Sequence, residues 1–312
     1  MNQLRLIWRM QRWELAFLVG GCLLLALAMA LVAWQLDVSR DALTACYADG
    51  AGPLSAECRS TIEWGNTMAG AVGILGPLAI VAPFAVGIFL GAPLVAREIE
   101  HRTAPIAWSL SPSRRTWLGH RTLPVIALVA VALLALGQAS ELMLTTAEQR
   151  ELSFGQYGMF GPMLAARGLA VFGIGLIVGL AIGRVLPAVL ATALATVLLV
   201  AGLSIGRDLM MRDEAVWRPM GDGSEVVYMV FDSGFQSDET GEVITWEQAF
   251  NEYPEAFTEF GEGAPPGMSP VWKIVPPEQF DVYEVREVGA LALTAVLLGG
   301  LALLLVGRRR PE

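Results

Sequence analysis

Long apolar runs alternate with shorter polar segments along this chain. Six runs stand out, at about residues 14–36, 68–92, 122–143, 159–183, 185–205 and 288–306. A helix needs ~20 mostly apolar residues to cross the hydrocarbon core of a bilayer. The pattern therefore predicts an all-α polytopic membrane protein with six transmembrane helices, the fourth and fifth joined by a tight turn at Arg184.

Basic residues predict the orientation of these helices. Clusters lie in the polar segment between the second and third runs, at Arg97, Arg102, Arg114, Arg115 and Arg121, and directly after the sixth run, at residues 308–310. Lysine and arginine accumulate in cytoplasmic loops. We therefore expect segment 94–118 and both chain ends on the cytoplasmic side, and the three other long connections outside.

The first thirteen residues alternate apolar with basic positions. Arg5, Arg9 and Arg12 fall on one face at helical spacing. This pattern predicts an amphipathic N-terminal helix lying on the inner leaflet. The alternative is a basic flank that only sets the orientation of the first span.

The segment 206–286 differs from the rest of the chain because it is polar and strongly acidic. It carries seventeen acidic residues against five basic ones, a net charge of −12. Because the fifth span leads out of the cytoplasm and the sixth leads back, we expect this segment to form an extracytoplasmic cap. The predicted organisation is thus membrane region 1–205, acidic cap 206–286, and last span with basic tail 287–312.

Short structural signals predict a small α+β fold for the cap. Residues 226–231 and 243–245 have strand character, and Thr245 with Gln248 fits a capping box for a helix reaching about Phe260. Four aromatic residues recur at steps of three and four along that helix: Trp246, Phe250, Tyr253 and Phe257. We expect this face to be buried against the strands.

Composition agrees with a membrane protein and argues against an enzyme. Charged residues make up 16% of the chain, against ~25% in soluble domains. The sequence has no G-x-x-x-x-G-K-[ST] phosphate loop, no H-E-x-x-H metal motif and no G-x-S-x-G elbow. We therefore predict a non-catalytic chain with no cofactor or metal of its own, which takes its energy from another polypeptide.

Two features inside the spans suggest contacts. Gly175, Gly179 and Gly183 form a stripe of small residues that predicts close packing on another helix, within the chain or across a dimer. Arg167 and Glu141 are ionisable residues in or near the bilayer, where charge is costly and normally faces a partner or a cavity. The alternative for Arg167 is a later start of the span, with the side chain reaching the headgroups.

The first outer loop contains two of the three cysteines, Cys46 and Cys58. Outside the cytoplasm such a pair favours a disulfide. Two free thiols are the alternative. Cys22, within the first span, fits a small buried apolar residue.

The stretch from Gly87 to Arg121 resembles a known family. It reads G-x-F-x-G-A-P-L-x-A-R-E-x-E-x-x-T-x-x-x-A-W-S, then S-x-S-R-R-x-W-L. This is similar to the segment between the second and third helices of type-2 ABC exporter permeases, in the branch common in actinobacteria. Two positions depart from the family: Arg102 stands where it usually has Gly, and His120–Arg121 stand where Lys is frequent.

The resemblance implies a site and a set of partners. In the family this segment is the coupling helix that contacts the ATP-binding subunit, which holds ATP and Mg²⁺. Carried over, the coupling residues are Arg97, Glu98, Glu100, Arg102, Thr103, Arg114, Arg115 and Trp117. The resemblance also implies a bacterial plasma-membrane location and pairing with a second permease copy or a homologue.

Two functional hypotheses follow. In the first, the chain is the membrane-spanning subunit of an ABC exporter. In the second, it is a membrane-anchored sensor or scaffold whose cap binds a ligand or a protein. Association with an ATPase distinguishes them, and the sequence does not specify a substrate.

Overall fold

The computed structural model describes residues 3–48, 56–148, 154–220, 229–257 and 264–308. The chain divides into two compact units. One comprises residues 1–151, 158–199 and 284–312, and the other comprises residues 152–157 and 200–283. Long helices build the first unit, and a small antiparallel sheet characterises the second.

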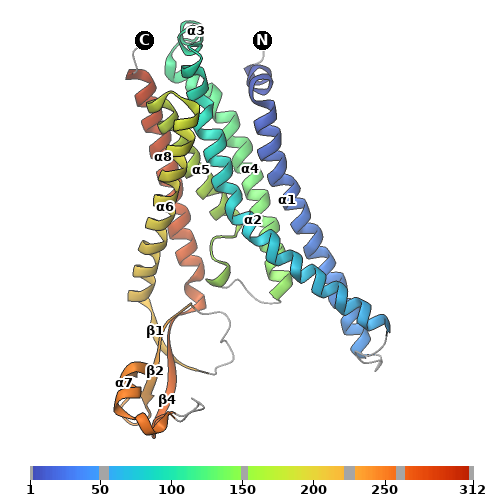
Figure 1. The fold of residues 1–312 in the computed structure, drawn as a ribbon, viewed down its shortest axis with the longest axis vertical. Coiled ribbons are helices and arrows are strands. Elements are labelled where there is room, and N and C mark those ends of the chain that lie inside the picture. The colour runs from blue at the N-terminus through green and yellow to red at the C-terminus, as the bar shows by residue number, and fades with distance from the viewer. Residues whose placement is uncertain (1–2, 49–55, 149–153, 221–228, 258–263, 309–312) are drawn as a thin grey trace. The chain divides into compact units, whose positions relative to one another are not determined.

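Among the described residues, six helices are long and apolar enough to cross a membrane, in agreement with the predicted number of spans. These are α1 (Gln3–Ala48), α2 (Ala56–Glu100), α4 (Arg114–Glu148), α5 (Gly161–Ile182), α6 (Val185–Glu214) and α8 (Phe280–Arg308). The short helix α3 (Ala104–Ser109) connects α2 to α4. Figure 1 shows α3, the start of α1 and the end of α8 at the same end of the helical unit.

Helices α1 and α2 extend well beyond the predicted spans. The basic segment 3–13 continues directly into the first span within α1, so the described backbone has no separate N-terminal helix. Helix α2 runs through Pro77, Pro83 and Pro93 without interruption and ends only at Glu100. The first part of the expected coupling segment is thus the last turns of a membrane helix.

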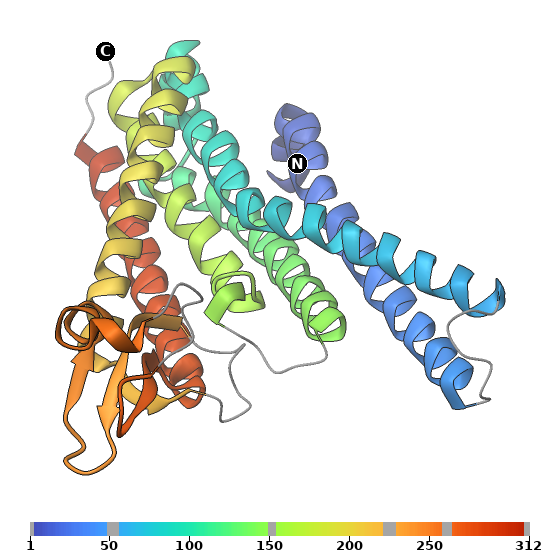
Figure 2. The ribbon, with the colours of Figure 1, turned by 60° about the horizontal axis from the view of Figure 1, so that its bottom comes forward.

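Helix α5 is the most buried of the six and packs against α2 and α4, while α1 packs against α2 and α4 (Figures 1 and 2). The α2–α5 contact depends on glycine. A Cβ at Gly175 would lie 2.7 Å from the backbone nitrogen of Ala92, and one at Gly91 would lie 2.5 Å from the carbonyl oxygen of Phe172. Small residues allow two membrane helices to approach backbone to backbone.

The predicted glycine stripe is divided between two roles. Gly175 and Gly179 both lie against Ala92 of α2. Gly183 instead ends α5 in the left-handed conformation, with φ of 68°, and its N–H donates to the carbonyl of Gly179. The chain then turns at once into α6.

The second unit holds a four-stranded antiparallel sheet in the order β1-β4-β2-β3. The strands are β1 (Val216–Pro219), β2 (Met229–Ser237), β3 (Val243–Thr245) and β4 (Met268–Val275). Helix α7 (Trp246–Glu252) follows β3 and packs on β2 and β3, with Ala249 and Phe235 buried. The unit also contains the end of α6 and the start of α8.

Comparison with the predicted cap shows two matches and two errors. The strand 243–245 and the Thr245–Gln248 capping box are both present. The helix is shorter than predicted because Pro254 opens a 3₁₀ turn after Glu252. The aromatic face is also only partly buried: Trp246 and Phe257 contact Phe235 of β2, but Trp246, Phe250 and Tyr253 remain 43%, 54% and 36% exposed. Of the other predicted strand, residues 226–228 lie outside the described part of the chain.

We expect Gly179→Leu to destabilise the helical unit strongly, because its Cβ would lie 2.4 Å from the carbonyl oxygen of Ala92, a backbone atom that cannot move aside. Overpacking alone costs ~1–3 kcal/mol. Thermal unfolding of the protein in detergent measures the loss. Gly70→Leu is the matched control, because a Cβ at Gly70 meets nothing within 4 Å. Equal melting temperatures for the two variants would contradict the close α2–α5 contact.

Candidate functional site

The last turn of α2 carries three charged side chains that reach three different helices. Arg97 donates to the carboxylate of Glu14 on α1, with Nη2 and Oε1 2.5 Å apart. Glu98 pairs with Arg121 on α4. Glu100 accepts a hydrogen bond of 2.9 Å from the backbone N–H of Val185, at the start of α6. The end of α2 is therefore a junction between α1, α4 and α6.

The Glu98–Arg121 pair is the most buried of these contacts. The side chains of Glu98 and Arg121 are 6% and 11% exposed. Oε2 of Glu98 and Nε of Arg121 have no hydrogen-bond partner in the described structure. A buried pair with incomplete hydrogen bonding gains little net stability, but removal of one partner leaves an uncompensated charge. The pair therefore specifies how α2 meets α4.

A Schellman turn ends α2 immediately after the junction. The N–H of Thr103 donates to the carbonyl of Glu98 at 2.9 Å, and the N–H of Arg102 donates to that of Ile99 at 3.1 Å. The hydroxyl of Thr103 also donates to the carbonyl of Glu98. Arg102 sits at the position that favours glycine, with φ of 55°. This is also the position at which the sequence departs from the glycine that the resemblance implies.

Helix α3 is fixed to α4 by aromatic and cationic contacts. The rings of Trp108 and Trp117 meet edge to face, with centroids 6.0 Å apart. The guanidinium of Arg114 lies 4.7 Å from the centre of the Trp108 ring. Both tryptophans are buried. Helix α3 thus packs one side firmly on α4.

The opposite side of α3 presents two apolar residues at helical spacing. Ile106 and Leu110 are 64% and 82% exposed. Leu110 is the residue that caps the end of α3, and its N–H donates to the carbonyl of Ile106, so the two lie on one face. Sequence reasoning overlooked this face because it followed the charges. The available signal was the alternation of Ile106 and Leu110 with Trp108.

The eight predicted coupling residues divide by environment. Glu98 and Trp117 are buried, and Arg97 and Arg114 are partly buried against partners within the chain. The remaining four are exposed: Glu100, Arg102, Thr103 and Arg115. Arg115 also lies close to Gly307 near the end of α8. Of the eight, these four are the most accessible to an external partner, and Ile106 and Leu110 are exposed in the same segment.

The two predicted intramembrane charges have different surroundings. Arg167 is paired with Glu287 of α8, with Nη2 and Oε1 2.8 Å apart, and it donates to the carbonyl of Gly158 at 3.1 Å. Its side chain is 13% exposed, so it does not reach out to a headgroup. Glu141 is half-buried and accepts from Gln138 one turn earlier on α4. Arg167 and Glu287 therefore link α5 to α8.

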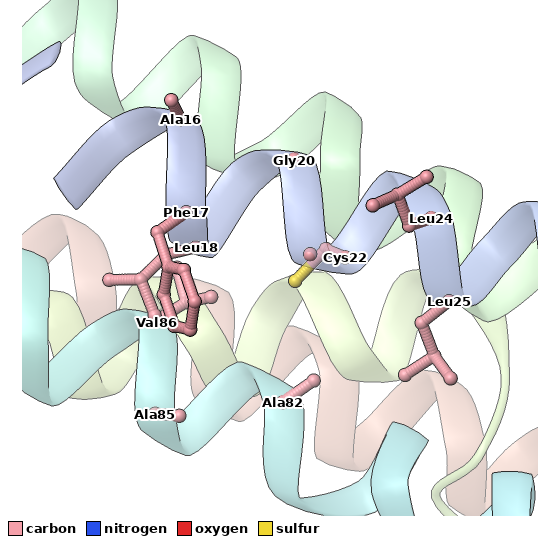
Figure 3. A pocket seen from close by; sticks show the side chains of 11 residues that line it. Ala16, Phe17, Leu18, Gly20, Cys22, Leu24, Leu25, Ala82, Ala85 and Val86 are labelled. Atoms are coloured by element: carbon pink, nitrogen blue, oxygen red, sulfur yellow. The ribbon is translucent and has the colours of Figure 1, made fainter. Parts of the chain in front are cut away.

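An apolar groove lies between parts of α1 and α2. Figure 3 shows Phe17, Leu18 and Val86 at one end of it and Leu25 at the other, with Cys22 between them. Its volume is about 420 Å³, and no charged side chain lines it. Among the described residues no cluster of three or more His, Cys, Asp or Glu could hold a metal ion.

Of the cysteines, Cys22 is a free buried thiol, whereas Cys58 is disulfide-bonded. The side chain of Cys46 lies outside the described residues. The Cys46–Cys58 pairing therefore stays a prediction.

Comparison with known proteins gives one finding. The family model described as ABC-2 membrane transporter related matches residues 19–206, which span the first five membrane helices and the α2–α3–α4 junction. No curated protein and no solved structure matches.

Arg102→Gly should stabilise the helical unit, because glycine adopts a positive φ without the ~1–2 kcal/mol penalty of other residues. Arg102→Val should destabilise it, since a β-branched side chain fits this conformation worse. The melting temperatures of the two variants in detergent should bracket that of the parent protein. If both melting temperatures shifted in the same direction, the result would contradict the left-handed turn at Arg102.

Glu98→Ala should lower stability by roughly 3–5 kcal/mol, because it leaves Arg121 buried without its counter-charge. Glu63→Ala, on the exposed part of the same helix, should change it by less than about 0.5 kcal/mol. Chemical denaturation of the purified protein measures both. The double variant Glu98→Ala/Arg121→Leu should recover part of the loss, and a further drop would show that the two charges act independently.

Proposed function

Because the chain belongs to the ABC-2 membrane transporter related family, and is thus a multi-pass permease component of an ABC transporter, we propose that it is the membrane subunit of an exporter. In this proposal separate ATP-binding subunits supply ATP and Mg²⁺ and dock on α3. A second permease copy or a homologue completes the pathway. The protein resides in a bacterial plasma membrane with both termini in the cytoplasm.

The exposed face of α3 is the observation that carries the docking proposal. Ile106 and Leu110 are an apolar pair on a helix whose other side is anchored through Trp108. Arg102 and Arg115 are exposed positive charges in the same segment. A buried apolar centre with a polar rim is the usual anatomy of a protein interface. The face thus has the composition expected of a docking surface.

The junction at the end of α2 provides the route by which docking would move the spans. Thr103 and α3 follow directly on the turn that ends α2, and Arg97, Glu98 and Glu100 connect that end to α1, α4 and α6. A displacement of α3 would therefore act on three further helices at once. Glu98 and Trp117 serve in this proposal as transmitting contacts and not as contacts to the ATPase.

The basic residues support the cytoplasmic placement of this end. Arg97, Arg102, Arg114 and Arg115 all lie at the α2–α3–α4 junction, and Arg308 ends α8 nearby, since Gly307 lies against Arg115. Positive charge favours the cytoplasmic side. The alternative hypothesis of a sensor or scaffold gains no support from the family match.

Ile106→Asp/Leu110→Asp should lower permease-stimulated ATP hydrolysis by roughly tenfold or more, equivalent to ~1.4 kcal/mol of binding. The measurement uses the permease purified together with its ATPase and reconstituted in vesicles. Two exposed apolar side chains are replaced without loss of a buried contact, so membrane insertion should be normal. Val216→Asp on β1, also an exposed apolar position, is the matched control. Full stimulation in the α3 variant would overturn the docking face.

A further inference from the structure

A cluster of four aromatic rings covers one side of the small sheet unit. Phe235 of β2 stacks against Trp246 of α7, with ring centroids 5.2 Å apart. Phe257 contacts Phe235, Trp246 and Phe250 at 5.8, 5.2 and 5.6 Å. Phe235 is almost completely buried and forms the base of the cluster.

The outer rings of this cluster remain accessible. Trp246 and Phe250 are four residues apart on α7 and therefore lie on one face. Tyr253 is the residue that ends the helix, and it is 36% exposed. Phe250 is the most exposed of them at 54%, and its ring contacts that of Phe257. Exposed aromatic rings gathered in this way mark binding surfaces more often than isolated ones do. We name Trp246, Phe250, Tyr253 and Phe257 the aromatic patch.

Carboxylates lie close in the sequence to the aromatic patch. Glu247 lies three residues before Phe250 and is therefore its neighbour on the helix surface. Glu252 and Glu255 are exposed in the same short stretch. The region 206–286 as a whole has the net charge of −12. The faces of the rings and the carboxylates both attract cations.

The negative charge of the unit makes some ligands of the aromatic patch more favourable than others. A second copy of this acidic unit would bring like charges together, and an anionic membrane surface would be repelled in the same way. A neutral apolar molecule would leave the carboxylates unused. A lipophilic organic cation matches both features, because its apolar groups contact the rings and its charge meets the carboxylates.

We propose that the aromatic patch is a binding site for small lipophilic organic cations, such as quaternary ammonium or phosphonium compounds. Phe250 and Trp246 provide the aromatic surface, and Glu247 provides the nearest charge. This site lies wholly within the sheet unit. It does not depend on the proposed export function, since binding requires neither ATP nor an ATP-binding subunit.

The test compares two ions of the same shape and opposite charge. The full-length protein in nanodiscs of zwitterionic lipid is dialysed to equilibrium with labelled tetraphenylphosphonium or tetraphenylborate, and empty nanodiscs give the lipid background. We expect saturable binding of the phosphonium ion and binding of the borate ion that is about tenfold weaker or less. Equal binding of the two ions would overturn the proposal, as would the absence of saturable phosphonium binding.

Three variants locate the site. Phe250→Leu keeps apolar volume but removes the ring, and should weaken phosphonium binding about fivefold. Glu247→Gln should weaken it about two- to threefold and reduce its dependence on salt. Val216→Ala, an exposed apolar position on β1, should have no effect. Saturable binding that neither Phe250→Leu nor Glu247→Gln alters would place the site elsewhere in the protein and refute the assignment.

Discussion

The arrangement of the spans at one end of the helical unit depends on the charged last turn of α2. Arg97, Glu98 and Glu100 occupy one helical turn, yet each of them contacts a different helix. Glu98 is the central member, because separation from Arg121 would leave two buried charges without a counter-charge. A movement of the end of α2 alone would break these contacts.

Glycine packing extends this constraint along α2. Gly87 and Gly91 on α2 and Gly175 and Gly179 on α5 bring the two backbones into contact over several turns. Contacts of this kind tolerate neither separation nor added volume, so α2 and α5 form one rigid element. The Arg167–Glu287 pair also links α8 to α5. Movement of the membrane region is thus expected between groups of helices and not within the α2–α5 pair.

The number and order of spans could be predicted from the sequence because apolar runs of sufficient length have few other uses. The residues at which the spans end could not be predicted in this way. Arg97 and Glu98 look like the start of an aqueous loop, but they continue α2, because Glu14 and Arg121 supply counter-charges that lie far away in the sequence. The left-handed turn at Arg102 was equally hidden, since arginine has no preference for that conformation.

In the sheet unit, local features could be predicted from the sequence, but the pairing of strands could not. Short residue patterns predicted the Thr245–Gln248 capping box and the strand after Gly241. Strands β1 and β4 were missed because Pro219, Pro270 and Lys273 weaken their signal, and pairing with each other is what stabilises them. The aromatic side chains were expected inside because sequence periodicity indicates a common face but not what covers it.

The edges of this sheet have a consequence for how other molecules can be recognised. The edge strand β1 has four residues and ends in Pro219, which has no backbone N–H to offer, and the opposite edge, β3, has three residues. Edges this short give an incoming peptide few backbone groups to pair with. Strand addition along β1 or β3 is therefore disfavoured, and recognition by these two strands is expected to depend on their side chains and not on their backbone groups.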